Sequence, residues 1–159
     1  MPVLIDGNNL VFAARDVESA EWQPGRTWLI ARLVEWGRRR RDDVCIVFDG
    51  RPPREPAPFA PSLSVIYSGA GVSADSVLIG LVQRDSAPRR LIVVSTDREI
   101  AAAARRRRAR AVRSDAFWRH VLHDLTRPVR RSVEPREKRT GLPPDQVDAW
   151  LRELGFEPQ

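Results

Sequence analysis

The sequence predicts an α/β domain in which a mostly parallel sheet of five strands lies between two layers of helices. Two observations support this fold class. Short apolar, strand-like runs alternate along the chain with helix-like segments, which is the pattern of successive β-α-β units. Two of these runs, at residues 44–48 and 91–94, are apolar at nearly every position, as expected for strands that are covered on both faces.

Three strands are expected in the first half of the chain, over residues 3–5, 44–48 and 63–67. Helices are expected over about 26–41 and 74–84. Trp28, Leu33 and Trp36 lie near helical spacing and indicate the first of these helices. Five prolines make residues 51–62 a loop, because proline lacks the N–H group that a strand or helix interior requires.

The second half of the chain continues the alternation. An apolar strand at 91–94 leads to Asp97, which opens a helix, and a short strand follows at 111–112. Ser114 is expected to cap a last helix whose apolar side carries Phe117 and Val121. These elements complete a domain over residues 1–125.

The remaining residues, 126–159, form a basic linker and a short helix in this prediction. The segment 126–140 is rich in arginine and broken by proline, so it is expected to be a linker or an extended arm. LPPDQVDAWLRELGF then predicts an amphipathic helix, with Val147, Trp150 and Leu154 on one face. That face either docks on the domain or binds a partner.

The charge of the chain favours an anionic partner only weakly. Its 159 residues carry a net charge of +6, and Lys138 is the only lysine. Arginine pairs with phosphate and stacks on bases, but a GC-rich genome explains an arginine excess equally well. No apolar run has the roughly 20 residues that a membrane span needs, and no secretory signal is evident. With a single cysteine, Cys45, these features predict a cytoplasmic protein without a membrane partner.

Four aspartates follow the predicted strands. Asp6 ends the first strand, Asp49 ends the second, Asp75 begins the helix after the third, and Asp97 follows the fourth. In a parallel sheet these points share the carboxyl edge, where open α/β sheets bind ligands. Carboxylates that converge there repel one another unless a proton or cation neutralises them, and an oxygen-only ligand set suits Mg²⁺ or Mn²⁺. Taken singly, each aspartate is equally well explained as a turn former or a helix N-cap.

Four motifs carry a family resemblance. DGNN, VFDG, ADS and STDREI, in this order over about residues 1–125, resemble the NYN-domain nucleases of the YacP-like group in the PIN-like superfamily. The resemblance implies a PIN-like three-layer αβα sandwich, a divalent-metal site and ribonuclease activity. It assigns catalytic positions to the four aspartates and to Asn8. Related helices commonly carry a glutamate about four residues after ADS, where this chain has Ile79 and Gly80, and the loss of that carboxylate would weaken metal binding.

The expected activity is metal-dependent endoribonucleolytic hydrolysis that leaves 5′-phosphate and 3′-hydroxyl ends, with ribosome-associated RNA among the candidate substrates. Metal ions would neutralise the phosphodiester, generate hydroxide and stabilise the leaving oxygen. Asp6 and Asp97 are expected as the main ligands, with Asp49 and Asp75 completing the site. The candidate RNA-contacting residues are Asn8, Ser95, Thr96, Arg98, Arg127, Arg130 and Arg131. The alternative is a non-catalytic RNA- or ribosome-binding module with a degraded site. The oligomeric state is left open.

A glycine-containing pattern and two arginine runs are also candidate ligand sites. The run GAGVSA at residues 69–74 fits a dinucleotide-binding GxGxxA pattern, but Asp75 puts a negative charge where a pyrophosphate would sit. The arginine runs at 38–41 and 105–108 lie at helix ends, so they are expected opposite the carboxyl edge.

Overall fold

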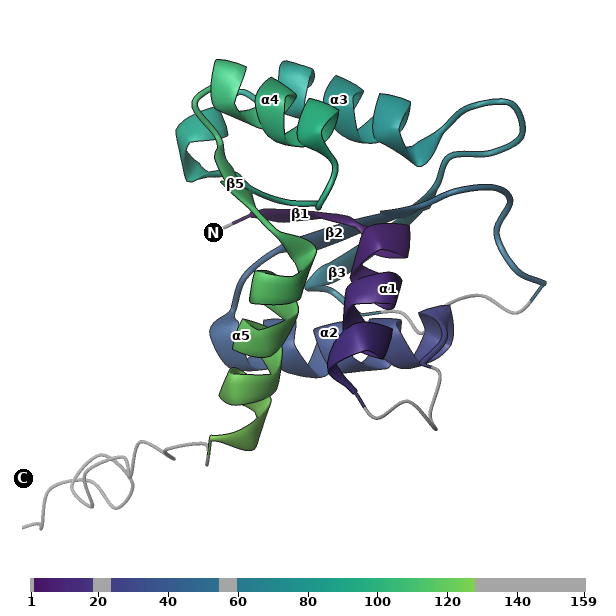
Figure 1. The fold of residues 1–159 in the computed structure, drawn as a ribbon, viewed down its shortest axis with the longest axis vertical. Coiled ribbons are helices and arrows are strands. Elements are labelled where there is room, and N and C mark those ends of the chain that lie inside the picture. The colour runs from purple at the N-terminus through teal and green to yellow at the C-terminus, as the bar shows by residue number, and fades with distance from the viewer. Residues whose placement is uncertain (1, 19–23, 55–59, 128–159) are drawn as a thin grey trace, which may run out of the picture. The chain divides into compact units, whose positions relative to one another are not determined.

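The sheet has five parallel strands in the order β3-β2-β1-β4-β5 (Figure 1). The structure is a computed structural model that describes residues 2–18, 24–54 and 60–127. The strands are β1 (Val3–Asp6), β2 (Val44–Phe48), β3 (Leu63–Tyr67), β4 (Ile92–Val94) and β5 (Arg110–Val112). The predicted parallel five-stranded sheet is therefore confirmed.

Helices cover both faces of the sheet. One layer contains α1 (Gly7–Val17), α2 (Arg26–Arg40) and α5 (Ser114–Thr126), and the other contains α3 (Ala74–Arg84) and α4 (Arg98–Arg106) (Figure 1). A short 3₁₀ turn, Pro88–Arg90, precedes β4. The predicted three-layer αβα sandwich is confirmed. Within the described residues, no helix is long and apolar enough to cross a membrane.

Each face of the sheet has its own apolar core. On the side of α1, α2 and α5, the fully buried Ile5, Leu10 and Trp118 belong to the larger cluster. On the side of α3 and α4, Leu78 and Ile100 pack with strand residues in the smaller one. The strands alternate between the two clusters, so nearly every residue of β1 and β2 is buried, as their apolar sequences indicate.

Two local features differ from the prediction. No helix was expected between the first strand and residue 26, yet α1 begins directly after β1 with Asp6 as its N-cap. Ser114 was expected to be an N-cap, but Arg113 holds that position and Ser114 is the first helical residue. The Ser114 hydroxyl is buried without a hydrogen-bond partner among the described residues, so its prediction as a cap is wrong. The predicted C-terminal helix lies outside the described residues.

The strand order reverses direction at β1, which makes the carboxyl end of β1 a topological switch point. From β1 the chain moves through β2 to β3 in one direction, whereas β4 lies on the other side of β1 and leads to β5. Helix α1, which follows β1, and helix α4, which follows β4, belong to opposite layers. Their N-termini therefore separate at the carboxyl ends of β1 and β4, which is where open α/β sheets bind ligands.

Gly7 makes the sharp step from β1 into α1 possible. A Cβ atom at this position would collide with the ring of Phe48 and would lie 2.8 Å from the carbonyl oxygen of Val47. We expect Gly7→Ala to lower the free energy of unfolding by about 1–3 kcal/mol, because overpacking in a dense core costs that much. Urea unfolding checks this value. The matched control is Gly37→Ala in α2, where the nearest atoms lie at 3.5 Å and the variant should be as stable as wild type or more so.

Candidate functional site

Asp6 lies at the centre of the carboxyl edge and is almost completely buried. The residue as a whole is 2% exposed. The Oδ1 atom accepts a hydrogen bond from the backbone N–H of Asn9 at 3.1 Å, which caps α1, and the Oδ2 atom accepts from the side-chain amide of Asn9. The hydroxyl of Ser95 also donates to Oδ2, at 2.9 Å. Three donors thus hold this carboxylate in one orientation at the end of the central strand.

Ser95 connects Asp6 to Asp97. Val94 pairs with Ile5, so the residue after β4 lies beside the residue that ends β1. The buried Ser95 hydroxyl donates to Asp6 and accepts from the backbone N–H of Asp97 at 3.0 Å. Asp97 is the N-cap of α4, and its Oδ1 atom accepts from the backbone N–H groups of Glu99 and Ile100. Its Oδ2 atom makes no hydrogen bond within the described residues.

Asp49 is held by the two helices that flank the end of β2. Its Oδ2 atom accepts from the side-chain amide of Asn8 at 2.6 Å, and its Oδ1 atom accepts from the backbone N–H of Ala74 at the same distance. This carboxylate occupies the positive N-terminal end of α3, where the GxGxxA pattern would place a pyrophosphate.

Arg26 extends the same chain of contacts from the start of α2. Its Nη2 atom donates to the Oδ1 atom of Asn8 at 3.1 Å, and its guanidinium carbon lies 5.0 Å from the centre of the Phe48 ring. Arg26 and Asp49 together orient the Asn8 amide, because one contacts its oxygen and the other its nitrogen. Sequence reasoning assigned no role to Arg26, which is 18 residues from Asn8.

Asp75 is the exposed member of the group. Ser73, not Asp75, caps α3, and the Asp75 carboxylate makes no hydrogen bond to the described residues. Desolvation raises the pKa of the Asp75 carboxyl above its usual value, and negative charges on other residues raise it further. In decreasing order of effect, those charges belong to Asp6, Asp97, Asp49 and Glu99. The acids from four different elements therefore interact electrostatically at one edge of the sheet.

The acids lie in one region without forming a closed cage. Among the described residues, no group of three or more Asp, Glu, His or Cys side chains is arranged to hold a metal ion as it stands. The hydrogen bonds of Asp6, Asp49 and Asp97 to neutral donors account for the orientation of these carboxylates. Of the four aspartates, Asp75 with both carboxylate oxygens and Asp97 with its Oδ2 atom lack such partners within the described residues.

Glu99 is a second residue that sequence reasoning did not assign to the site. It lies in the first turn of α4 and lines a cavity of about 380 Å³ together with Ile79. Ile79 stands in the region where related helices commonly carry a glutamate. A carboxylate is thus present beside that region, although it comes from the neighbouring helix. In the sequence, the one indication that Glu99 belongs near the site is that it follows Asp97 by two residues.

The predicted RNA-contacting residues fall into three groups. Ser95 is buried among the acids, whereas Thr96 and Arg98 are exposed and line a cavity with Asp97. Arg127 follows α5, and its carbonyl oxygen accepts from Arg39 at the end of α2, so it lies at the opposite edge of the sheet. The structure does not bring Arg127 to the acids. Arg130 and Arg131 lie outside the described residues.

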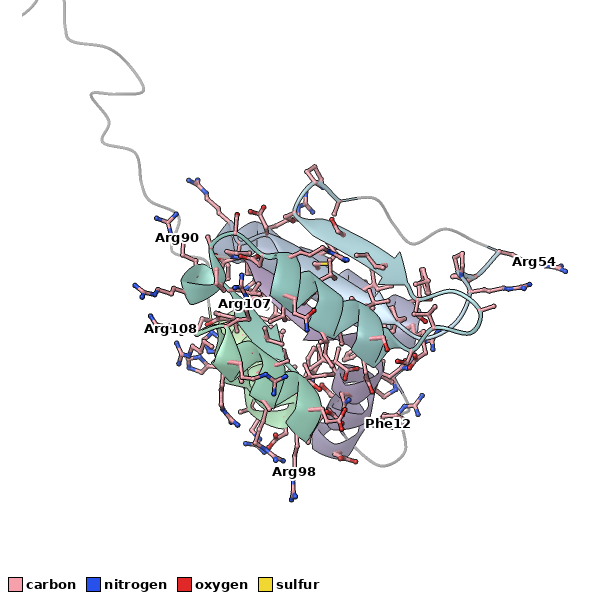
Figure 2. The ribbon with its side chains drawn as sticks, turned by 90° about the horizontal axis from the view of Figure 1, so that it is seen from above. Phe12, Arg54, Arg90, Arg98, Arg107 and Arg108 are labelled. Atoms are coloured by element: carbon pink, nitrogen blue, oxygen red, sulfur yellow. The ribbon has the colours of Figure 1, made fainter. Side chains whose placement is uncertain are left out.

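Within the run 105–108, Arg107 and Arg108 point away from the acids, whereas Arg105 and Arg106 line cavities to which Asp97 and Glu99 contribute. Figure 2 shows Arg107 and Arg108 away from Phe12 and Arg98, and Arg107 donates to the carbonyl oxygen of Asp85 at the end of α3. The prediction is confirmed for these two residues. Arg105 differs, because it lines the same cavity as Asp97 and Arg98.

Comparisons with known proteins identify the family. No curated protein matches the chain significantly. Two crystal structures of Rae1 (YacP) from Bacillus subtilis share its fold. The first is 19% identical and has a TM-score of 0.64, and the matched region covers 98% of this chain and 88% of the Rae1 chain. The second, a W164L mutant, is 18% identical and has a TM-score of 0.61, and the matched region covers 97% of this chain and 83% of the mutant chain.

The family model agrees with the resemblance seen in the four motifs. The model of the YacP-like NYN domain matches residues 3–150, which is most of the chain and includes every acid described above. Its family is of the nuclease type, and the structural neighbours have the same PIN-like architecture. The chain therefore belongs to the family of YacP-like NYN domains.

Proposed function

We propose that this protein is a divalent-metal-dependent endoribonuclease that hydrolyses RNA to 5′-phosphate and 3′-hydroxyl ends in the cytoplasm. The observation that carries the proposal is the gathering of acids at the carboxyl edge beside β1, where desolvation and then the charges of Asp6, Asp97, Asp49 and Glu99 raise the pKa of Asp75. Like charges gathered at a ligand-binding edge are costly for stability and typical of catalytic centres. The nuclease-type family supports the same reaction class.

The donor set fits Mg²⁺ or Mn²⁺. The four aspartates and Glu99 offer only carboxylate oxygens as ligands, and hard divalent cations prefer carboxylate oxygen. Asp75 and the Oδ2 atom of Asp97 offer oxygens that no other described residue contacts by a hydrogen bond, and Asp6 and Asp49 supply the remaining negative charge. A bound cation would supply charge neutralisation and an activated water.

The neutral residues have separate tasks in this proposal. Ser95 holds the Asp6 carboxylate and the backbone at Asp97 in one register, so the two acids keep a fixed separation. Asn8, held from both sides by Arg26 and Asp49, orients water or a scissile phosphate. Thr96 and Arg98 contact the RNA backbone beside the acids.

A non-catalytic RNA- or ribosome-binding module is the second candidate. The observation that favours it is Ile79, which replaces an acidic residue common in related helices. Glu99 beside Ile79 and the presence of all four aspartates favour the enzyme.

The two candidates differ in what happens to bound RNA. The wild-type protein should cut single-stranded or structured RNA with Mg²⁺ or Mn²⁺, leave 5′-phosphate ends, and stop when EDTA is added. Asp97→Asn, which keeps an N-capping side chain, should bind RNA and fail to cut it. If the wild type binds RNA but does not cleave it with either Mg²⁺ or Mn²⁺, the protein is a binding module and not a nuclease.

Arg26 gives a separate test of how Asn8 is oriented. We expect Arg26→Ala to slow RNA cleavage by roughly tenfold, because residues that orient catalytic groups typically contribute factors of about 10–100. The melting temperature should change little, since Arg26 is exposed. Arg32→Ala, on the same helix and also exposed, is the matched control and should cleave at the wild-type rate. Equal rates for the two variants would remove Arg26 from the site.

A further inference from the structure

A basic cavity lies directly beside the acids. It has a volume of about 390 Å³ and is formed by the residues after β4, one face of α4, and β5 with Arg113. Asp97 lines one part of it and Arg105 another. Eight residues of helix separate these two, which corresponds to about 12 Å along the axis of α4. The cavity therefore extends from the proposed catalytic centre along the helix.

The charges that line this cavity are mainly positive. Arg98, Ala101 and Arg105 lie at positions i, i+3 and i+7 of α4 and so share one face, with a small side chain between the two arginines. Arg113 contributes a third guanidinium from the end of β5, and its Nε atom donates to Asp115 at 3.0 Å. Figure 2 shows Arg98 extending outward from the domain.

Two of the three arginines have no partner in the described part of the chain. The guanidinium groups of Arg98 and Arg105 make no hydrogen bond or ion pair with residues 2–18, 24–54 or 60–127, and both residues are exposed. Arg107, by contrast, donates to a backbone carbonyl, and Arg39 pairs with Glu35. Unpaired guanidinium groups along a cavity are suited to an anion, and arginine binds phosphate oxygens through two parallel hydrogen bonds.

We propose that this cavity holds the phosphodiester backbone of the RNA strand next to the bond that is cut, with Arg105 as its outer phosphate contact. The inference rests on the proposed ribonuclease function and adds the path of the strand. The residues that line the cavity include no aromatic side chain on which a base could stack, so a strand held there is held by its phosphates. Arg105 therefore contributes affinity that does not depend on RNA sequence.

Salt-dependent binding tests the contact without requiring catalysis. Anisotropy of a 5′-labelled uridine 12-mer in EDTA would be measured at several salt concentrations for wild type, Arg105→Gln and Arg90→Gln. Both variants lose one positive charge, and Arg90 lies away from Arg98 (Figure 2). We expect Arg105→Gln to weaken binding about tenfold and to reduce the slope of log K against log salt by about 0.7. Arg90→Gln should leave both near the wild-type values.

The outcomes separate this proposal from the proposed function. If Arg105→Gln and Arg90→Gln weaken binding equally, or if the wild type does not bind the oligonucleotide, the cavity is not a phosphate site. If the wild type cleaves RNA, Arg105→Gln should raise KM without lowering kcat, because its contact is remote from the reacting atoms. If the difference between the variants is found but no metal supports cleavage, the phosphate site stands and the nuclease function fails.

Discussion

Replacing Asp75 with asparagine is expected to abolish RNA cleavage and at the same time to raise the melting temperature of the protein. Cleavage should fall by about 100-fold or more, because even residues that only support metal ligands contribute factors of about 10–100. Stability should rise because asparagine removes a charge that is disfavoured first by desolvation and then by repulsion from the neighbouring acids. No hydrogen bond within the described residues is lost, since the Asp75 carboxylate makes none there.

The gain in stability should depend on pH. Because the pKa of Asp75 is raised in the folded state, ionising it favours the unfolded chain. This destabilisation is complete above the raised pKa and is lost as the pH falls through it. The difference in melting temperature between Asp75→Asn and wild type should therefore be largest at neutral pH and shrink on acidification.

A matched substitution checks that the effect is local. Asp16→Asn changes an exposed aspartate at the far end of α1 and should leave RNA cleavage at the wild-type rate. Melting curves at several pH values and rates of RNA cleavage are the measurements. An Asp75→Asn variant that cleaves normally, or that is less stable than wild type at neutral pH, would contradict the electrostatic description of the site.

Replacing Asp6 with asparagine should instead abolish cleavage and destabilise the fold. Both carboxylate oxygens of Asp6 accept hydrogen bonds. Oδ1 accepts from the backbone N–H of Asn9, and Oδ2 accepts from the side-chain amide of Asn9 and from the Ser95 hydroxyl. An amide nitrogen in either orientation would therefore face a donor, in a place that is only 2% exposed. The unpaired groups should lower the free energy of unfolding by about 1–3 kcal/mol.

Asp97→Asn is the matched comparison for Asp6→Asn. Its Oδ1 atom alone accepts the N-cap hydrogen bonds, so the amide nitrogen of an asparagine can take the place of Oδ2. This variant should lose cleavage while its urea midpoint stays close to that of wild type. If Asp6→Asn unfolds at the same urea concentration as Asp97→Asn, the hydrogen bonds of Asp6 do not stabilise the fold as described.

Much of the fold could be predicted because apolar strands and their spacing are local signals. The nearly continuous apolar run of β2 predicted a strand covered on both faces, and in the structure nearly every residue of β2 is buried. Helix α1 could not be recognised in the same way. Its first residues, Gly7 to Asn9, are poor helix formers, and the helix depends on the Asp6 cap and on packing of Leu10 and Ala14.

The candidate site was predictable only to the extent that topology determines it. The rule that parallel strands share a carboxyl edge was enough to gather Asp6, Asp49 and Asp97 in one region. It contains no information about which donors orient each carboxylate, because those contacts join residues far apart in sequence. Ser95 contacts Asp6 across 89 residues, and Arg26 reaches Asn8 across 18.

A titration with Mn²⁺ shows, without any RNA, whether the acids at this edge bind a divalent metal ion. Electron paramagnetic resonance would follow free Mn²⁺ in the presence of wild type and of Asp75→Asn. We expect saturable binding by wild type and binding weaker by about tenfold or more in the variant. Saturable binding of equal strength in both proteins, or none in wild type, would contradict it.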